Sequence, residues 1–188
     1  MKIKALLFSV LTTALLFTSL NARECIDIKS VDIDWTSYKT MAKIGVSGTF
    51  NGVTLSKSKD TSTLNSALVG TSVSIQLKSI NAKAAIKTSN IVKFFIAKLS
   101  TKSIHAKITK LGDKTLALEI LLNGRKQVIP MKYTLDGGVM QASGVIDARD
   151  FSIESALRNL NIHVPAHRNK GWLDIAIGFE LIYTDACN

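Results

Sequence analysis

Apolar and polar residues alternate along much of this chain, which is typical of β-strands that bury one face. The alternating segments lie at residues 43–50, 73–78, 103–108, 116–122 and 173–183. The last segment is the longest, and its apolar side chains recur at every second position. A sheet with one apolar face must close on itself or pack on a second layer. The pattern therefore predicts an all-β protein.

Turn signals separate these segments. Asn123-Gly124 is the strongest, because both residues tolerate the positive φ of a type I′ turn. Asp136-Gly137-Gly138 and Leu111-Gly112-Asp113 mark two further turns. Because the turns join consecutive segments, we expect the strands to form an antiparallel meander.

Two segments have the period of a helix instead. Residues 83–99 place most of their lysines opposite one broad apolar face. That face consists of Ile86, Ile91, Phe94, Phe95 and Leu99. Residues 152–160 predict a second, short helix, with Ser152 as its N-cap. The expected fold thus contains one or two short helices.

The composition is that of one folded domain after a targeting segment. The chain has 188 residues, of which 46% are apolar and only two are proline, so it can build a core. Residues 5–20 carry no charge, follow Lys2 and Lys4, and precede a small residue, Ala22. This is the pattern of a secretory signal peptide. We expect a signal peptide at residues 1–22 and an exported domain at residues 23–188, with a retained membrane anchor as the alternative.

Export changes the interpretation of the two cysteines. Cys25 and Cys187 lie at opposite ends of the expected domain, and in an oxidising compartment they would form one disulfide. Such a bridge requires Cα atoms about 5.5 Å apart, as in a closed barrel whose first and last strands meet. The alternative is a pair of free thiols.

The formal net charge is +10, and most of the basic residues are lysines. Nucleic-acid binding is not expected, because arginines and interleaved aromatics are scarce. Between Thr61 and Gly112 the chain has no acidic residue but many lysines. This stretch is either a solvated face or a positive surface that meets anionic membrane headgroups or an anionic ligand.

The residues that carry chemistry do not form a recognisable catalytic motif. His163 and His167 have the i, i+4 spacing of a helical metal pair, but Pro165 excludes an ordinary helix interior between them. We therefore expect no metal site and no catalytic residue. The alternative is an enzyme in which these histidines converge with Asp147 or Asp150 at a barrel mouth.

Several short motifs occur in a characteristic order. They are Trp35 before a strand that ends in Gly48-Thr49-Phe50, the run Ser79-Ile80-Asn81-Ala82, the pair Phe94-Phe95, the hairpin at residues 123–128, and the segment at residues 146–151. In this order they resemble the YceI-like family of polyisoprenoid-binding proteins, and the resemblance extends over residues 31–184.

The resemblance implies a lipocalin-like, antiparallel β-barrel of about eight strands. It also implies that the apolar lumen holds a polyisoprenoid or another long-chain amphiphile, such as a fatty acyl compound, without a cofactor, and that the protein is periplasmic. Lys87 and Lys93 stand where the family often has an acidic residue and an arginine, and the terminal cysteine pair is not general. The headgroup of the ligand is therefore left open.

The apolar alternation predicts which side chains line such a lumen. They are Phe50, Ile75, Leu77, Ile91, Phe94, Phe95, Leu118, Ile120, Ile175, Ile177 and Phe179. Small residues at Gly48, Ala106, Ala142 and Gly144 would leave room along the axis. The alternative is that these side chains only fill a packed core. Whether the protein is a monomer or a homodimer stays open.

Overall fold

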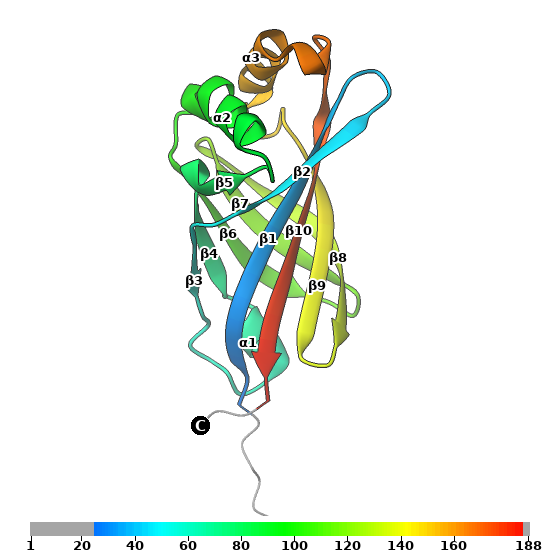
Figure 1. Ribbon diagram of the computed structural model, residues 1–188. Helices are drawn as coiled ribbons and strands as arrows, with labels where there is room; N and C mark the ends of the chain where they lie inside the picture. The colour runs from blue at the N-terminus through cyan, green and yellow to red at the C-terminus, as the bar shows by residue number, and fades with distance from the viewer. Residues whose placement is uncertain (1–24, 186–188) are drawn as a thin grey trace, which may run out of the picture.

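The structure is a computed structural model that describes residues 25–185, so the predicted signal peptide at residues 1–22 lies outside the described residues. Ten antiparallel strands curl into one sheet, two longer helices cover one end of it, and a short helix lies at the other end (Figure 1). The strands are β1 (Asp27–Lys39), β2 (Ile44–Phe50), β3 (Val53–Ser56), β4 (Ser72–Gln76), β5 (Ile80–Asn81), β6 (Ser103–Leu111), β7 (Thr115–Leu122), β8 (Arg125–Asp136), β9 (Val139–Asp147) and β10 (Gly171–Thr184). The helices are α1 (Leu64–Leu68), α2 (Ala85–Phe94) and α3 (Glu154–His163), with short 3-10 turns η1 (Leu77–Ser79), η2 (Ile96–Lys98) and η3 (Pro165–His167). The all-β prediction is confirmed.

The strand order explains how ten strands form a barrel with eight strand positions. The order is β3-β4-β6-β7-β8-β9-β10-β1-β2-β5, so β3 and β5 are its two ends. However, β3 continues the chain of β2 and β5 continues that of β4. Backbone hydrogen bonds join the two ends, from Asn51 N to Ser79 O at 3.0 Å and from Gln76 N to Gly52 O at 2.9 Å. When β2 with β3, and β4 with β5, are each counted as one strand, the barrel has the predicted size of about eight strands.

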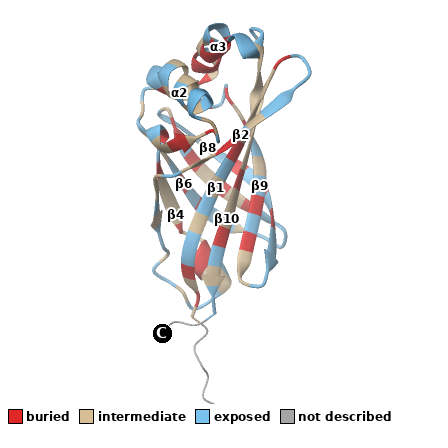
Figure 2. Ribbon diagram, viewed as in Figure 1, coloured by how far each residue is buried: buried red, intermediate tan, exposed pale blue. Residues whose placement is uncertain are grey.

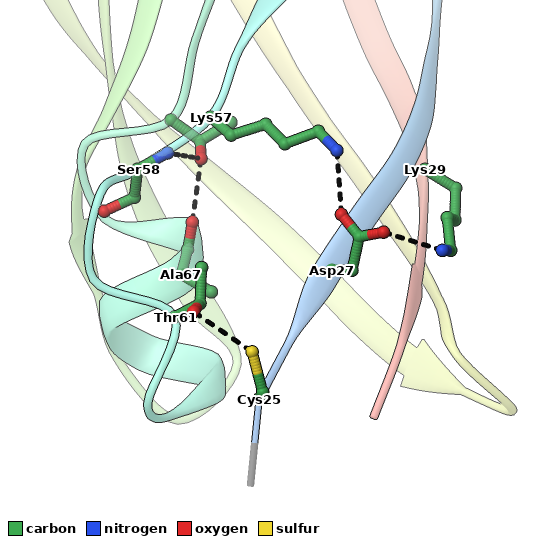
Figure 3. Close-up of polar contacts among 8 residues, drawn as sticks. Cys25, Asp27, Lys29, Lys57, Ser58, Thr61 and Ala67 are labelled. Atoms are coloured by element: carbon green, nitrogen blue, oxygen red, sulfur yellow. Dashed lines mark hydrogen bonds and ion pairs between the residues drawn. The ribbon is translucent and has the colours of Figure 1, made fainter. Parts of the chain in front are cut away.

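The first and last strands are neighbours, as a disulfide between the chain ends would require. Strand β1 pairs with β10 in a register that sets Asp27 opposite Thr184. Cys25 precedes β1, and its Sγ lies 3.3 Å from Thr61 Oγ1 (Figure 3). Cys187 lies outside the described residues, so the Cys25–Cys187 disulfide stays a prediction.

The predicted hairpins occur where the sequence placed them. Asn123 and Gly124 have φ values of 51° and 77°, and they form the tight turn between β7 and β8. The Asn123 side chain also accepts a hydrogen bond from Ser100 N at 2.8 Å and donates one to Ser152 O at 3.1 Å. This hairpin therefore ties together the chain after η2 and the turn before α3, which holds both helices against the barrel end.

Buried apolar side chains close the end of the barrel that α1 covers. Leu68 of α1 and Met140 of β9 are fully buried there, and Leu116 and Leu181 are 3% and 2% exposed. Figure 2 shows the expected alternation of buried and exposed positions along the strands, and it shows that α2 carries little buried surface. The two ends of the barrel therefore differ in packing.

The two predicted helices form with corrected details. The first shortens to α2, which ends at Phe94 before the η2 turn. Ser152 is not the N-cap of α3: its φ is +53°, and its amide donates to Arg149 O within a turn. A side-chain N-cap needs an extended backbone, so α3 begins only after Ile153, at Glu154. Within residues 25–185, no helix is long and apolar enough to cross a membrane.

Candidate functional site: the barrel cavity

The inside of the barrel contains a cavity of about 430 Å³. Aliphatic and aromatic side chains from nearly every strand form its wall, together with residues from α2, α3 and the η2 and η3 turns. Its volume lies within the range of about 300–1,000 Å³ that is usual for small-molecule sites. The barrel is therefore hollow on the side of α2 and α3 and filled at the end that α1 covers.

Ten of the eleven predicted lining residues lie on this cavity wall. They are Phe50, Ile75, Leu77, Ile91, Phe95, Leu118, Ile120, Ile175, Ile177 and Phe179. Their placement follows the alternation of the strands, because every second side chain of a barrel strand points inward. Whether these residues contact a ligand stays a prediction.

Phe94 is the exception, because it lies outside the cavity lining. Its ring stacks on His163 of α3, with ring centroids 4.8 Å apart, and its carbonyl accepts a hydrogen bond from Asn159 Nδ2 at 2.6 Å. Neighbouring residues on a helix point about 100° apart. Phe95 therefore faces the cavity, while Phe94 joins α2 to α3.

The exposed fraction of the cavity-wall side chains distinguishes between a hollow lumen and a packed core. Ile175, Ile177 and Phe179 share the inner face of β10 with Leu181, but only Leu181 is buried. The other three side chains retain accessible surface although they point into the barrel. A close-packed interior leaves few voids larger than a water molecule. Along the inner face of β10, the cavity lining thus changes from a buried side chain at Leu181 to side chains that retain accessible surface.

The cavity opens beside the first turn of α2. Ile86 belongs to the cavity lining and is nevertheless 70% exposed. Ile86 thus shares the cavity-facing side of the helix with Ile91, as predicted, but it lies at the solvent-exposed edge of that side. We call this opening the mouth. It is bordered by residues of α2, the end of β1 and the η3 turn.

Several polar residues of the cavity lining lie at the mouth. They include Lys39 at the end of β1, Lys87 and Asn90 on α2, Asn161 on α3 and His167 on η3. Neither ammonium group forms an ion pair within residues 25–185. The lining also includes the polar residues Asp34, Ser37, Thr71 and Ser72, but most of its other residues are apolar. At the mouth it offers hydrogen bonds and the ammonium groups of Lys39 and Lys87.

His167 is held in this border by Asn161. Asn161 is 6% exposed, and its Oδ1 lies 2.7 Å from His167 Nδ1, which can donate a hydrogen bond to it. Burial, followed by the charge of Lys39, lowers the pKa of His167 below its ordinary value. Both effects favour the neutral form of the imidazole. Gly171 makes room for Asn161, because a Cβ on Gly171 would overlap its side-chain amide.

Only one of the four predicted small residues leaves space in the lumen. Ala106 lines the cavity, whereas Gly48, Ala142 and Gly144 do not. The Trp35 indole occupies the space above Gly48, since a Cβ there would lie 2.6 Å from Trp35 Cζ2. Met131 fills the space over Gly144 in the same way. These glycines accommodate large neighbouring side chains rather than a ligand.

The residues of the enzyme alternative do not gather at one site. Asp147 is ion-paired to Arg149 at 2.6 Å, and hydrogen bonds from Arg149 lower the pKa of Asp147 to about 2. His163 stacks on Phe94, with its Nδ1 2.8 Å from Asn159 O. Of His163, His167, Asp147 and Asp150, only His167 lines the cavity. Among residues 25–185, no group of three His, Cys, Asp or Glu side chains could hold a metal ion.

Comparison with protein-family models and with curated proteins finds no match, but solved structures with the same fold exist. A polyisoprenoid-binding domain from Saccharophagus degradans, implicated in plant cell wall breakdown, superposes with a TM-score of 0.60 at 15% identity, over 87% of this chain and 99% of that one. Burkholderia cenocepacia BcnA gives a TM-score of 0.56 at 13% identity, over 84% and 99% of the two chains. A Campylobacter jejuni YceI protein gives 0.53 at 15% identity, over 76% and 86%. This chain has the YceI-like fold.

The YceI-like barrel contains functional candidates that the sequence did not reveal. The mouth residues Lys39, Asn90 and Asn161 come from three distant segments, and no local motif connects them. Trp35 was recognised only as part of a motif, although it lines the cavity. Lys87 departs from the family pattern, and this departure is the one sequence signal that points to the polar mouth.

Proposed function

We propose that this protein is an exported, periplasmic carrier that binds one long-chain amphiphile, such as a polyisoprenoid or a fatty acyl compound, in its barrel. The observation that carries the proposal is the hollow, apolar half of the barrel. The polyisoprenoid-binding domain from Saccharophagus degradans shares the fold, which supports a ligand of this kind. Export rests on the signal-peptide pattern of residues 1–22.

The physical basis is the transfer of a hydrocarbon chain from water into an apolar lumen. Each buried CH2 contributes ~0.8 kcal/mol, so a chain of about fifteen carbons contributes ~12 kcal/mol. Association costs at least ~4 kcal/mol in lost freedom of motion. The remaining ~8 kcal/mol corresponds to a Kd of about 1 μM. An apolar chain can therefore be retained without polar contacts along the barrel.

The two ends of the cavity assign an orientation to the ligand. At the far end, Leu68 of α1 and Met140 leave no accessible space. At the mouth, Lys39, Lys87 and Asn90 offer charge and hydrogen bonds. We therefore expect the hydrocarbon tail to point toward α1 and the polar headgroup to stay at the mouth. The protein would protect and transfer this molecule without changing it chemically.

The test is to purify the exported protein and to identify lipid that travels with it, by native mass spectrometry followed by extraction. Uptake of a fluorescent acyl probe would then be measured for wild type, Phe95→Gln and Phe94→Gln. Phe95 lines the cavity and its neighbour Phe94 does not, so only Phe95→Gln should reduce uptake strongly. Folding of each variant is checked by the denaturant midpoint. A wild-type protein that carries no lipid and takes up no probe would refute the proposal.

A further inference from the structure

The cavity mouth lies in a surface that combines exposed apolar side chains with excess positive charge. Three chain segments form this end of the barrel: the hairpin of β1 and β2, α2 with its flanks, and α3 with the η3 loop (Figure 1). We call it the helical end. Four of its large apolar side chains project into solvent: Met41 is 78% exposed, Ile44 52%, Ile86 70% and Ile162 62%. They occur in all three segments, and Ile86 stands at the mouth itself.

The charge of the helical end is mainly positive. Residues 39–50, 83–99 and 155–170 include lysines and arginines but no aspartate or glutamate. Asp147 ends β9 and Asp150 lies in the turn before α3, and Asp147 is ion-paired to Arg149. Glu154, at the start of α3, has one carboxylate oxygen buried. Lys43 is ion-paired to Asp174 of β10 at 2.7 Å. No other basic side chain of the helical end forms a salt bridge within the described residues.

The opposite end of the barrel has a different balance. There Asp27 lies between Lys29 and Lys57, at 2.6 Å and 2.7 Å from their ammonium groups (Figure 3). Asp60, Asp113 and Asp136 occur in the loops of the same end. Positive charge there is compensated locally, whereas at the helical end it is available to an external partner.

We infer that the helical end docks on an anionic lipid bilayer, so that the mouth opens against the membrane surface. Apolar side chains that project among basic ones can insert at the boundary of headgroups and acyl chains, while the lysines attract anionic lipid. The charge complementarity selects a bilayer rather than a second copy of this chain, because two such basic faces would repel each other. The role of this docking surface rests on the proposed function. A hydrophobic ligand could then pass between bilayer and lumen without crossing water.

Vesicle flotation measures docking directly. The mature protein is mixed with vesicles of phosphatidylcholine alone and with vesicles that also contain phosphatidylglycerol. We expect binding to the anionic vesicles only, and we expect it to weaken as salt shortens the Debye length below about 10 Å. Loss of one lysine near the surface should weaken binding about fivefold. Lys83→Gln/Lys98→Gln should therefore reduce binding by about 25-fold.

Matched variants locate the surface. Lys110→Gln/Lys132→Gln removes the same charge from exposed strand positions outside the helical end, and it should reduce binding much less. Met41→Ser/Ile162→Ser should abolish most of the salt-resistant binding. Val128→Ser/Val145→Ser, at wall positions that are 56% and 58% exposed, should leave it unchanged. Equal losses in the end and wall variants would overturn the inference.

Two further measurements separate this inference from the proposed function. Probe uptake in the absence of vesicles should be unaffected by all four double variants, because none of their residues lines the cavity. Sedimentation velocity tests the competing occupant. The docking inference is wrong if two results are found together: the wild type forms a dimer that Met41→Ser/Ile162→Ser dissociates, and the wild type does not bind anionic vesicles. This holds whether or not the probe enters the barrel.

Discussion

Ala106 gives a direct test of whether the barrel is hollow or packed. It lies on β6 between Val73 of β4 and Ile120 of β7, and its side chain lines the cavity. Replacement by Phe puts an aromatic ring into space that we expect the ligand to occupy. Ala142 on β9 is the matched control, because it is as buried as Ala106, at 6% against 8% exposure, but does not line the cavity.

The two substitutions should have opposite signatures. If the Ala106→Phe ring displaces only two or three CH2 groups of the ligand, it removes ~1.6–2.4 kcal/mol of binding energy. This corresponds to an affinity about 15- to 50-fold weaker. The ring enters an existing void, so the free energy of unfolding should not fall and can rise by up to ~2 kcal/mol. Ala142→Phe overpacks a filled region and should cost ~1–3 kcal/mol.

The assay pairs two measurements on each purified variant: the Kd for a fluorescent acyl probe and the denaturant midpoint at a constant m-value. Wild type and Ala142→Phe should bind the probe alike in conditions where both are folded. If Ala106→Phe destabilises the protein as much as Ala142→Phe does, the space beside Ala106 is not available. If it is stable and binds the probe normally, the ligand does not occupy the cavity.

Three further predictions concern the stability of the barrel that surrounds the site. Gly48→Ala forces a Cβ against the Asn81 carbonyl oxygen and the Trp35 indole, and it should cost ~1–3 kcal/mol of stability, as measured by denaturant unfolding; an unchanged midpoint would contradict this packing. The pKa of Asp147, about 2 in the folded protein, lies below the ~3.9 of an unfolded aspartate, so its stabilisation is present above pH ~4 and is lost as the pH falls toward 2. Asp147→Asn should therefore lower the thermal midpoint at pH 6 and lose this difference near pH 2. Peptide mapping under non-reducing conditions should find Cys25 linked to Cys187, and reduction should lower Tm without abolishing the fold; two free thiols would refute the bridge.

The fold was readable from the sequence because its signals are local. Alternation at every second residue specifies which face of a strand is apolar, and the Asn123-Gly124 turn joins neighbouring strands whatever the rest of the chain does. These signals placed most of the lining residues on the inner face. Helix position was less accurate, since Ser152 was assigned as an N-cap from its residue type although the turn before α3 gives it a positive φ.

The candidate site needed the tertiary structure at three points. Phe94 and Phe95 have the same chemistry, and only the position of α3 decides which ring faces the cavity. The mouth assembles Lys39, Lys87 and His167 from segments far apart in the chain. No periodic pattern relates them, because their proximity depends on how the barrel closes and how α2 and α3 cover its end.

The sequence by itself determined the strands, their apolar faces and the turns that order them as an antiparallel barrel. The structure decided that this barrel is hollow beneath α2 and α3 and filled above α1. Whether a void remains depends on the summed volume of all inward side chains relative to the space that the strands enclose. Ile177 and Leu181 occupy equivalent positions in the pattern of β10 and both line the cavity, yet Leu181 is buried and Ile177 retains accessible surface. That difference comes from their neighbours across the barrel, which no local stretch of sequence specifies.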